Sequence, residues 1–219
     1  MNILSLVQTA LELGLICSLT VLALFLSYSM LNVCDLSTDG CFTLGAAVGA
    51  TVAIAGHPYL AILAAMAAGV LSGFITALLQ TKMGIDSLLA GIIVNTGLYS
   101  INIAVMGGSS LLNMNKTETV FTKARALLQG TVLSEQYKLL VAVIAVIAVV
   151  AFLALFLRTR LGLAIRATGD NPDMVRSSSI NADLTRTAGV MLANALVAGD
   201  YEKAYGLLDV LFYQNEEPI

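Results

Sequence analysis

Charge is scarce in this sequence of 219 residues. Asp, Glu, Lys and Arg make up 11% of it and apolar residues 58%, whereas a soluble domain carries roughly 25% charged residues. A soluble protein of this length needs more polar side chains to cover its surface. The shortage therefore argues against a water-soluble fold and indicates that lipid surrounds most of the chain.

Residues suited to catalysis or metal binding are also scarce. The sequence has one histidine, His57, and three cysteines, and no His, Asp or Glu pair has metal-ligand spacing. Asp35 and Asp39 lack the rest of a calcium-loop pattern, and the phosphate-binding pattern G-x-x-x-x-G-K-[ST] is absent. We therefore expect no metal, no cofactor, no nucleic-acid partner and no enzymatic activity.

Long uncharged stretches predict an all-α, polytopic membrane bundle. A spanning helix needs about 20 apolar residues. The sequence predicts about five such helices and a partial sixth, preceded by an interfacial segment at residues 1–10; the expected helices are residues 11–33, 41–56, 58–82, 87–106, 137–157 and the shorter 188–199. The second is only about 24 Å long, so it either crosses or re-enters the membrane.

Turn and cap residues separate these stretches. Asp39, followed by Gly40, is expected to cap the second helix, and Pro58 suits the first position of the third. Gly84 is expected to end the third helix. A surface helix is predicted at residues 116–130, with Val120, Ala124 and Leu127 on one face.

Small and polar residues within the apolar stretches suggest where helices meet. Two G-x-x-x-G pairs are expected to bring helices close together; they are Gly45 with Gly49, and Gly69 with Gly73. Two open interpretations apply to the polar residues, which either cap or join helices or line a substrate path; these candidates are Asp35, Asp39, Asn95 and Asn102.

One polar segment interrupts the apolar chain near its C-terminal end. Residues 158–186 hold five of the eleven Lys and Arg residues, which favours a cytoplasmic location. Asn171 followed by Pro172 is a strong helix start, so a short helix is expected at residues 172–180, after sharp turns at Gly162 and Gly169. Two turns of helix are marginal alone. The segment is therefore either a solvated loop or a docking site.

Two stretches resemble a known family. The segment "TRLGLAIRATGDNPDMVRSSSI" resembles the cytoplasmic coupling loop of permease subunits in binding-protein-dependent ABC importers. The branch includes the branched-chain amino acid and ribose permeases. The stretch "DLSTDGCFTLGAAVGA" is similar to the signature of an uncharacterised subgroup linked to tryptophan or related amino acids.

The resemblance implies a membrane-embedded permease in the inner membrane. Its expected partners are a cytoplasmic ABC ATPase, an extracytoplasmic substrate-binding protein, a second permease copy and the lipid bilayer. The substrate would be an amino acid or similar small solute. The residues implied in ATPase coupling are Arg166, Gly169, Asp170, Asn171, Pro172, Asp173, Met174, Val175, Arg176 and Ile180.

The C-terminal end departs from the family pattern. Residues 1–199 are interpreted as the permease domain, with an incomplete sixth helix, and residues 200–219 as an atypical acidic tail. We expect a C-terminal truncation. A fragment of an ion-driven secondary transporter, a membrane-embedded enzyme and a non-transporting membrane-anchored protein remain alternatives. The first would require a charged midplane site, and the second would require clustered catalytic groups.

Overall fold

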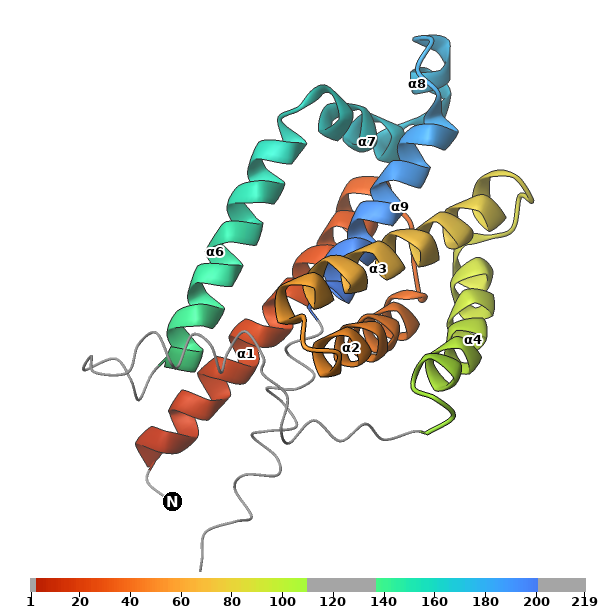
Figure 1. The fold of residues 1–219 in the computed structure, drawn as a ribbon. Coiled ribbons are helices and arrows are strands. Elements are labelled where there is room, and N and C mark those ends of the chain that lie inside the picture. The colour runs from red at the N-terminus through yellow and green to blue at the C-terminus, as the bar shows by residue number, and fades with distance from the viewer. Residues whose placement is uncertain (1–2, 110–136, 201–219) are drawn as a thin grey trace, which may run out of the picture.

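The computed structural model describes residues 3–109 and 137–200, which fold into helices without strands (Figure 1). The all-α prediction is therefore confirmed for this part of the chain. The predicted surface helix at residues 116–130 and the acidic tail after Asp200 lie outside it. The helices are α1 (Ile3–Phe25), the π-helical η1 (Leu26–Met30), α2 (Thr38–Ile54), α3 (Pro58–Thr81), α4 (Ser87–Val105), α6 (Tyr137–Leu157), α7 (Arg160–Asp170), α8 (Pro172–Ser177) and α9 (Ala182–Ala198).

The first helix differs from its prediction at both ends. It already begins at Ile3, so most of the expected interfacial segment is part of α1. It ends in η1, after which the chain turns at Asn32 with a φ of +52°. Ser27 and Val33 hold this turn, because the Val33 amide donates to the Ser27 carbonyl and the Ser27 hydroxyl donates to the Val33 carbonyl, each at 3.2 Å. The helix therefore stops short of the predicted residue 33.

The second helix is short and begins inside the bundle, at the buried residues Ser37 and Thr38. Its 17 residues correspond to about 25 Å. The predicted cap at Asp39 is wrong, because the helix begins one residue earlier and Asp39 lies exposed in its first turn. The carboxylate that accepts a backbone amide just before α2 is Asp35, whose Oδ1 accepts a hydrogen bond from the Ser37 amide at 2.8 Å.

The third and fourth helices follow their turn signals to within one residue. Pro58 occupies the start of α3, where its missing N–H leaves no helical bond unmade. Gly84, with a φ of +66°, turns the chain after α3. Asp86 then caps α4, accepting from the Leu88 amide at 2.9 Å.

The polar segment contains more helix than the sequence predicts. The expected turns at Gly162 and Gly169 are wrong, because both glycines lie within α7. They serve close approach instead: a Cβ at Gly169 would collide with the Met30 carbonyl oxygen. The sixth apolar helix also begins earlier than predicted, at Ala182, because Asn181 caps its polar first turn.

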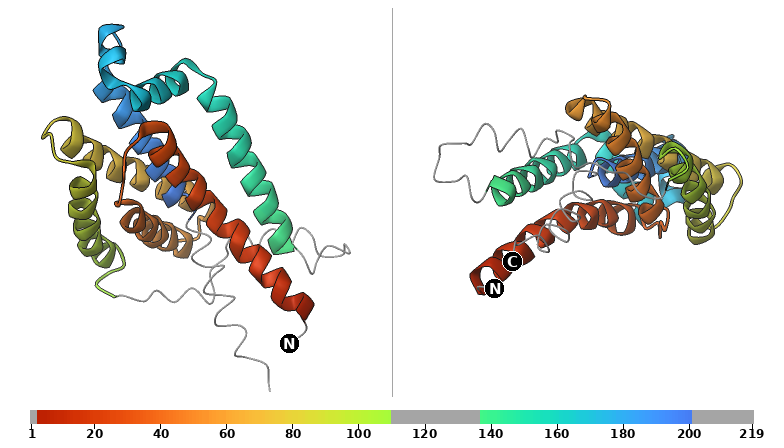
Figure 2. Two further views of the ribbon diagram at one scale, coloured as in Figure 1. Left: turned by 180° about the vertical axis from the view of Figure 1, so that it is seen from behind. Right: turned by 60° about the horizontal axis from the view of Figure 1, so that its bottom comes forward.

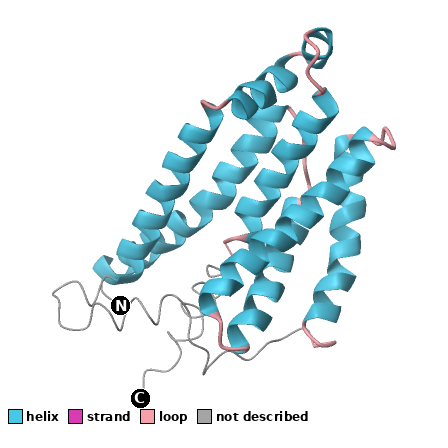
Figure 3. Ribbon diagram, turned by 45° about the horizontal axis from the view of Figure 1, so that its top comes forward, coloured by secondary structure: helices cyan, strands magenta, loops and turns pink. Residues whose placement is uncertain are grey.

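The helices pack around a central pair, α3 and α9 (Figures 1 and 2). α2 lies against both, and α4 packs on α2 at one side of the molecule. α1 and α6 pair at the other side. Figure 3 shows α7, α8 and the α3–α4 turn at one end of the molecule, and the N-terminal end of α1 at the other. Lys82, which follows α3, therefore lies toward the same end as the polar segment.

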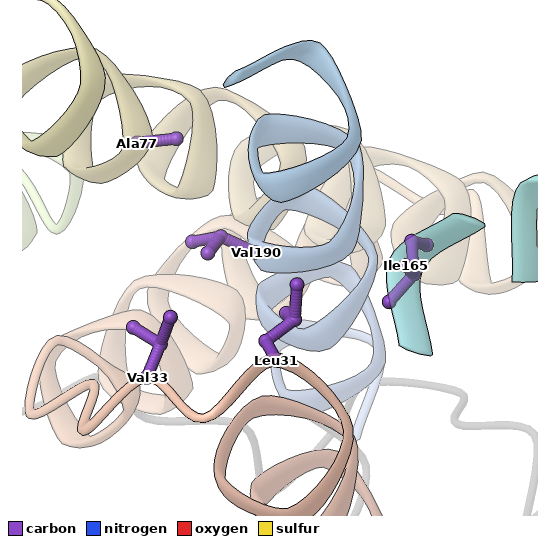
Figure 4. Packing of buried hydrophobic residues seen from close by; sticks show 5 residues of the cluster. All are labelled: Leu31, Val33, Ala77, Ile165 and Val190. Carbon is purple, nitrogen blue, oxygen red and sulfur yellow. The ribbon is translucent and has the colours of Figure 1, made fainter. Parts of the chain in front are cut away.

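The largest buried apolar cluster joins the end of η1 to the central pair (Figure 4). Its members come from four parts of the chain and are Leu31, Val33, Ala77, Ile165 and Val190. Gly189 makes room for this packing, because a Cβ there would lie 2.6 Å from the Leu31 side chain. The cluster brings α3, α7 and the segment after η1 into contact with α9.

Length and apolar composition qualify two described helices as membrane spans, within Tyr59–Thr81 and Ser87–Val105. A third span is possible by these criteria if α6 and α7, bent by 78° at their junction, act as one. Two shorter apolar helices are Cys17–Met30 and Thr38–Ile54. The structure therefore has the composition of a helical membrane bundle, and the predicted number of crossings stays a prediction.

Candidate functional site

The segment from Arg160 to Ile180, here called the coupling segment, forms a separate helical unit at one end of the bundle. Thr159 starts it, with its hydroxyl oxygen accepting from the Gly162 amide at 3.3 Å. Gly162 lies so close to the backbone of Phe156 and Leu157 that a Cβ would clash there. This tight junction sets α7 across the end of α6.

Helix α8 is short and locally capped. Asn171 Oδ1 accepts from the amides of Asp173 and Met174, both at 3.1 Å, as its sequence predicts for a cap. The helix ends at Ser177, earlier than the predicted residue 180, because Ser179 adopts a φ of +62°. The cap supplies hydrogen-bond partners that a helix of this length cannot provide for itself.

The outer surface of α8 is both apolar and charged. Met174 is 68% exposed and Ile180 42%, whereas Val175 is buried. Arg176 forms ion pairs with Asp173 at 3.5 Å and with Asp183, in the first turn of α9, at 3.2 Å. Such exposed pairs contribute about 0.2–1 kcal/mol each. They orient α8 on α9 and leave the apolar side chains available to a partner.

The other predicted coupling residues surround this surface. Arg166 and Asp170 are exposed on α7, and Pro172 is exposed at the start of α8. A cleft of about 160 Å³ between the coupling segment and the end of η1 is lined by Asn32 and Gly169, among others. The ten predicted residues lie close together in the sequence, and the structure places them on α7, on α8 and in the turns at the ends of α8; Val175 is buried and Gly169 packs against Met30, and the coupling role stays a prediction.

The candidate path residues fall into two groups. Asn95 and Asn102 lie on the face of α4 that meets α2: a Cβ at Gly40 would collide with Asn95 Oδ1, and Asn102 Nδ2 donates to Thr43 at 2.7 Å. Asp35 is buried before α2, and Asp39 is exposed. The structure therefore shows Asn102 joining α2 and α4.

Asp35 belongs to a set of buried polar residues that meet at Ser37, of which only Asp35 is among the path candidates selected from the sequence. Asn194 Nδ2 and Thr76 Oγ1 both approach Ser37 Oγ, at 3.2 and 3.3 Å. We call this set the inner polar cluster; its members are Asp35, Ser37, Ser72, Thr76 and Asn194, each at most 7% exposed. A signal existed: Ser72 and Thr76 are spaced by one helical turn in an otherwise apolar stretch.

The selected glycines lie at helix crossings. A Cβ at Gly69 would lie 2.6 Å from the Cβ of Ala198, and one at Gly73 would lie 2.8 Å from Met191 Cα. A Cβ at Gly45 would clash with the Ala198 backbone, and Gly49 is buried. Gly45, Gly69 and Gly73 thus let α2 and α3 approach α9 closely.

A family model described as a branched-chain amino acid transport system permease component matches residues 6–199. The chain belongs to this family. It is 33% identical over 186 residues to a tyrosine transport system permease protein of Clostridioides difficile (strain R20291), covering 84% of this chain and 59% of the relative. It is 31% identical over 190 residues to an uncharacterised protein of Rickettsia prowazekii (strain Madrid E), covering 87% and 64%.

Membership confirms the resemblance to this permease family seen in the sequence. The chain spans about six-tenths of the length of these two relatives. No solved structure matches it.

Proposed function

We propose that this chain is a multi-pass permease subunit of an ABC importer in the cytoplasmic membrane. The family match supports this assignment. The relative that carries the name of a tyrosine transport system permease supports an amino acid or similar small solute as substrate. ATP hydrolysis would take place in a partner subunit.

The observation that carries this proposal is the construction of α8. Its hydrogen bonds are satisfied locally by Asn171, while Met174 and Ile180 remain exposed. An apolar surface flanked by charges, at the end of a membrane protein, suits docking of a water-soluble partner. We assign this partner as a cytoplasmic ABC ATPase that contacts α8 and its approach from Arg166 to Asp170.

The same contacts offer a route for movement into the bundle. Gly169 of α7 lies against the Met30 carbonyl, and Gly189 of α9 lies against Leu31. A displacement of α7 would therefore reach η1 and the turn at Asn32, and from there the start of α2. π-Helical turns often occur at functional sites, which fits a role for η1 in this movement.

The remaining partners follow from the assignment. A second permease copy would complete the translocation path, and an extracytoplasmic binding protein would deliver the solute. Residues Asp35, Asp39, Asn95 and Asn102 are proposed to lie along this path. The exposed carboxylate of Asp39 would face it directly, whereas Asp35 would act from inside the bundle.

Co-purification with a co-expressed ABC ATPase tests the proposal. Replacing residues 169–176 with a flexible Gly/Ser linker of equal length should abolish capture of the ATPase and leave membrane insertion unchanged. A matched control replaces Lys82 and Met83, which are exposed at the same end of the molecule, with serine; this variant should retain capture. Undiminished capture by the linker variant would disprove the coupling role.

A further inference from the structure

The inner polar cluster contains a carboxylate without a counter-ion among the described residues. Asp35 is 6% exposed. Its Oδ1 accepts from the Ser37 amide at 2.8 Å, whereas its Oδ2 has no hydrogen-bond partner within residues 3–109 and 137–200. The ion pairs recorded in the described part of the chain lie at Arg176, at the end of the bundle. An ionised carboxylate away from water is costly unless another group compensates its charge.

Further oxygen atoms of the inner polar cluster have no hydrogen-bond partner among the described residues. Asn194 uses its Nδ2 to donate to Ser37 Oγ at 3.2 Å, and its Oδ1 is one of these oxygens. Ser72 Oγ is another, one turn before Thr76, whose hydroxyl lies 3.3 Å from Ser37 Oγ. Cys41 also contacts α9, donating to the Asn194 carbonyl at 3.3 Å. Side chains of α3 and α9 and the carboxylate of Asp35 thus meet at Ser37 in one hydrogen-bonded set.

The charge of the cluster sets the class of ligand. The N-terminal end of α2 offsets only part of the Asp35 charge, because a helix end carries about half a unit. The described residues contain no group of three or more His, Cys, Asp or Glu that could hold a metal, and divalent ions such as Ca²⁺ prefer several charged oxygen ligands. One carboxylate with neutral oxygens therefore suits a single positive charge.

We propose that the inner polar cluster binds a monovalent cationic group, with Asp35 supplying the charge and Asn194 and Ser72 supplying further oxygen contacts. The group is either an alkali metal ion or the ammonium group of a solute. If the bound group is the ammonium of a solute, the proposal rests on the proposed transport function, and the amino group of the solute would lie at Asp35. If the bound group is an alkali metal ion, the proposal does not depend on the transport function.

Thermal unfolding of the purified chain in lipid nanodiscs tests the site directly. The probes are NaCl, KCl and a mixture of the standard amino acids, each titrated against a background of a bulky organic cation. Ligand that binds the folded state raises the unfolding midpoint. We expect either the alkali salts or the amino acids to raise the unfolding midpoint. Asp35→Asn should weaken the affinity for that probe by about tenfold or more, because the variant loses a charge-assisted contact.

Asp86→Asn is the matched control, because Asp86 is an exposed carboxylate at the start of α4, where asparagine caps a helix about as well as aspartate, and it should leave the response unchanged. A response to the amino acids identifies the solute as the source, and a response to NaCl or KCl identifies the metal ion. If Asp35→Asn does not fold, Ser72→Ala should weaken the response several-fold instead. The proposed site would be wrong if no probe raised the unfolding midpoint. It would also be wrong if a folded Asp35→Asn variant responded as the unmodified protein does. Where Asp35→Asn does not fold, an unchanged response in Ser72→Ala would have the same meaning.

ATPase capture through α8 is measured separately, so failure of the cation site and failure of the proposed transport function can be distinguished.

Infrared spectroscopy gives a second measurement on the cation site. A protonated carboxyl group gives its own infrared band. If such a band is present with and without ligand and is absent in Asp35→Asn, Asp35 is neutral, and the proposal is overturned.

Discussion

The coupling segment and the inner polar cluster both place polar residues in an apolar protein, but they satisfy them differently. In the coupling segment, Asn171 Oδ1 accepts hydrogen bonds from two free amides at the start of α8, and Arg176 is paired twice. In the inner polar cluster, oxygens of Asp35 and Asn194 have no partner in the part of the chain that the structure describes. Polar groups whose hydrogen bonds are satisfied locally stiffen a surface that a partner can bind. Buried polar groups without hydrogen-bond partners need another explanation, and a bound ion is one of them.

The largest expected effect comes from the helix crossing beside the inner polar cluster. Gly69→Ala should destabilise the protein by about 1–3 kcal/mol, because the added Cβ would collide with the Asn194 carbonyl and lie 2.6 Å from Ala198 Cβ. Thermal unfolding in nanodiscs measures the loss. Gly97→Ala is the control, since a Cβ there meets nothing within 4 Å; equal losses in both variants would contradict the packing.

Substitutions of two helix caps with equal geometry test whether α8 serves docking or stability. Asn171 and Asn181 each accept from two backbone amides at 3.1 Å, at the starts of α8 and α9. Replacing such a cap with alanine costs about 1 kcal/mol. Asn171→Ala should weaken ATPase capture with little change in the unfolding midpoint, and Asn181→Ala should lower the midpoint more than it affects capture. The reverse pattern would show that α8 is structural.

The smallest expected effect concerns the exposed ion pairs. Arg176→Ala removes contacts to Asp173 and Asp183, and should cost less than about 1 kcal/mol. Its effect on capture should shrink as salt concentration rises, because salt screens exposed charges. A large effect that persists at high salt would mean that Arg176 contacts the ATPase through a desolvated pair.

Local sequence signals predicted the local features of this fold. Pro58, Gly84 and Asn171 each determine a turn or cap within a few residues, so the boundaries of α3 and the starts of α4 and α8 could be predicted directly. The predicted span of α1 failed at its C-terminal end because nothing in the apolar run marks the π turn or the bend at Asn32.

The long-range features depend on packing that the sequence does not display. Gly162 and Gly169 looked like turn residues, but they permit contacts with Phe156 and Met30 from other elements. The coupling residues are contiguous in the sequence and could be selected together. The inner polar cluster joins residues up to 157 positions apart, as in the contact of Ser37 with Asn194, so its assembly required the structure.

Photo-crosslinking tests the docking role of α8 most directly. A photoreactive residue placed at Met174, 68% exposed on α8, is compared with one at Tyr99, 69% exposed on α4, in cells that also produce the ABC ATPase. The account predicts a crosslink to the ATPase from Met174 and none from Tyr99. Crosslinking from Tyr99 alone, or labelling of Met174 exclusively by extracytoplasmic proteins, would contradict it.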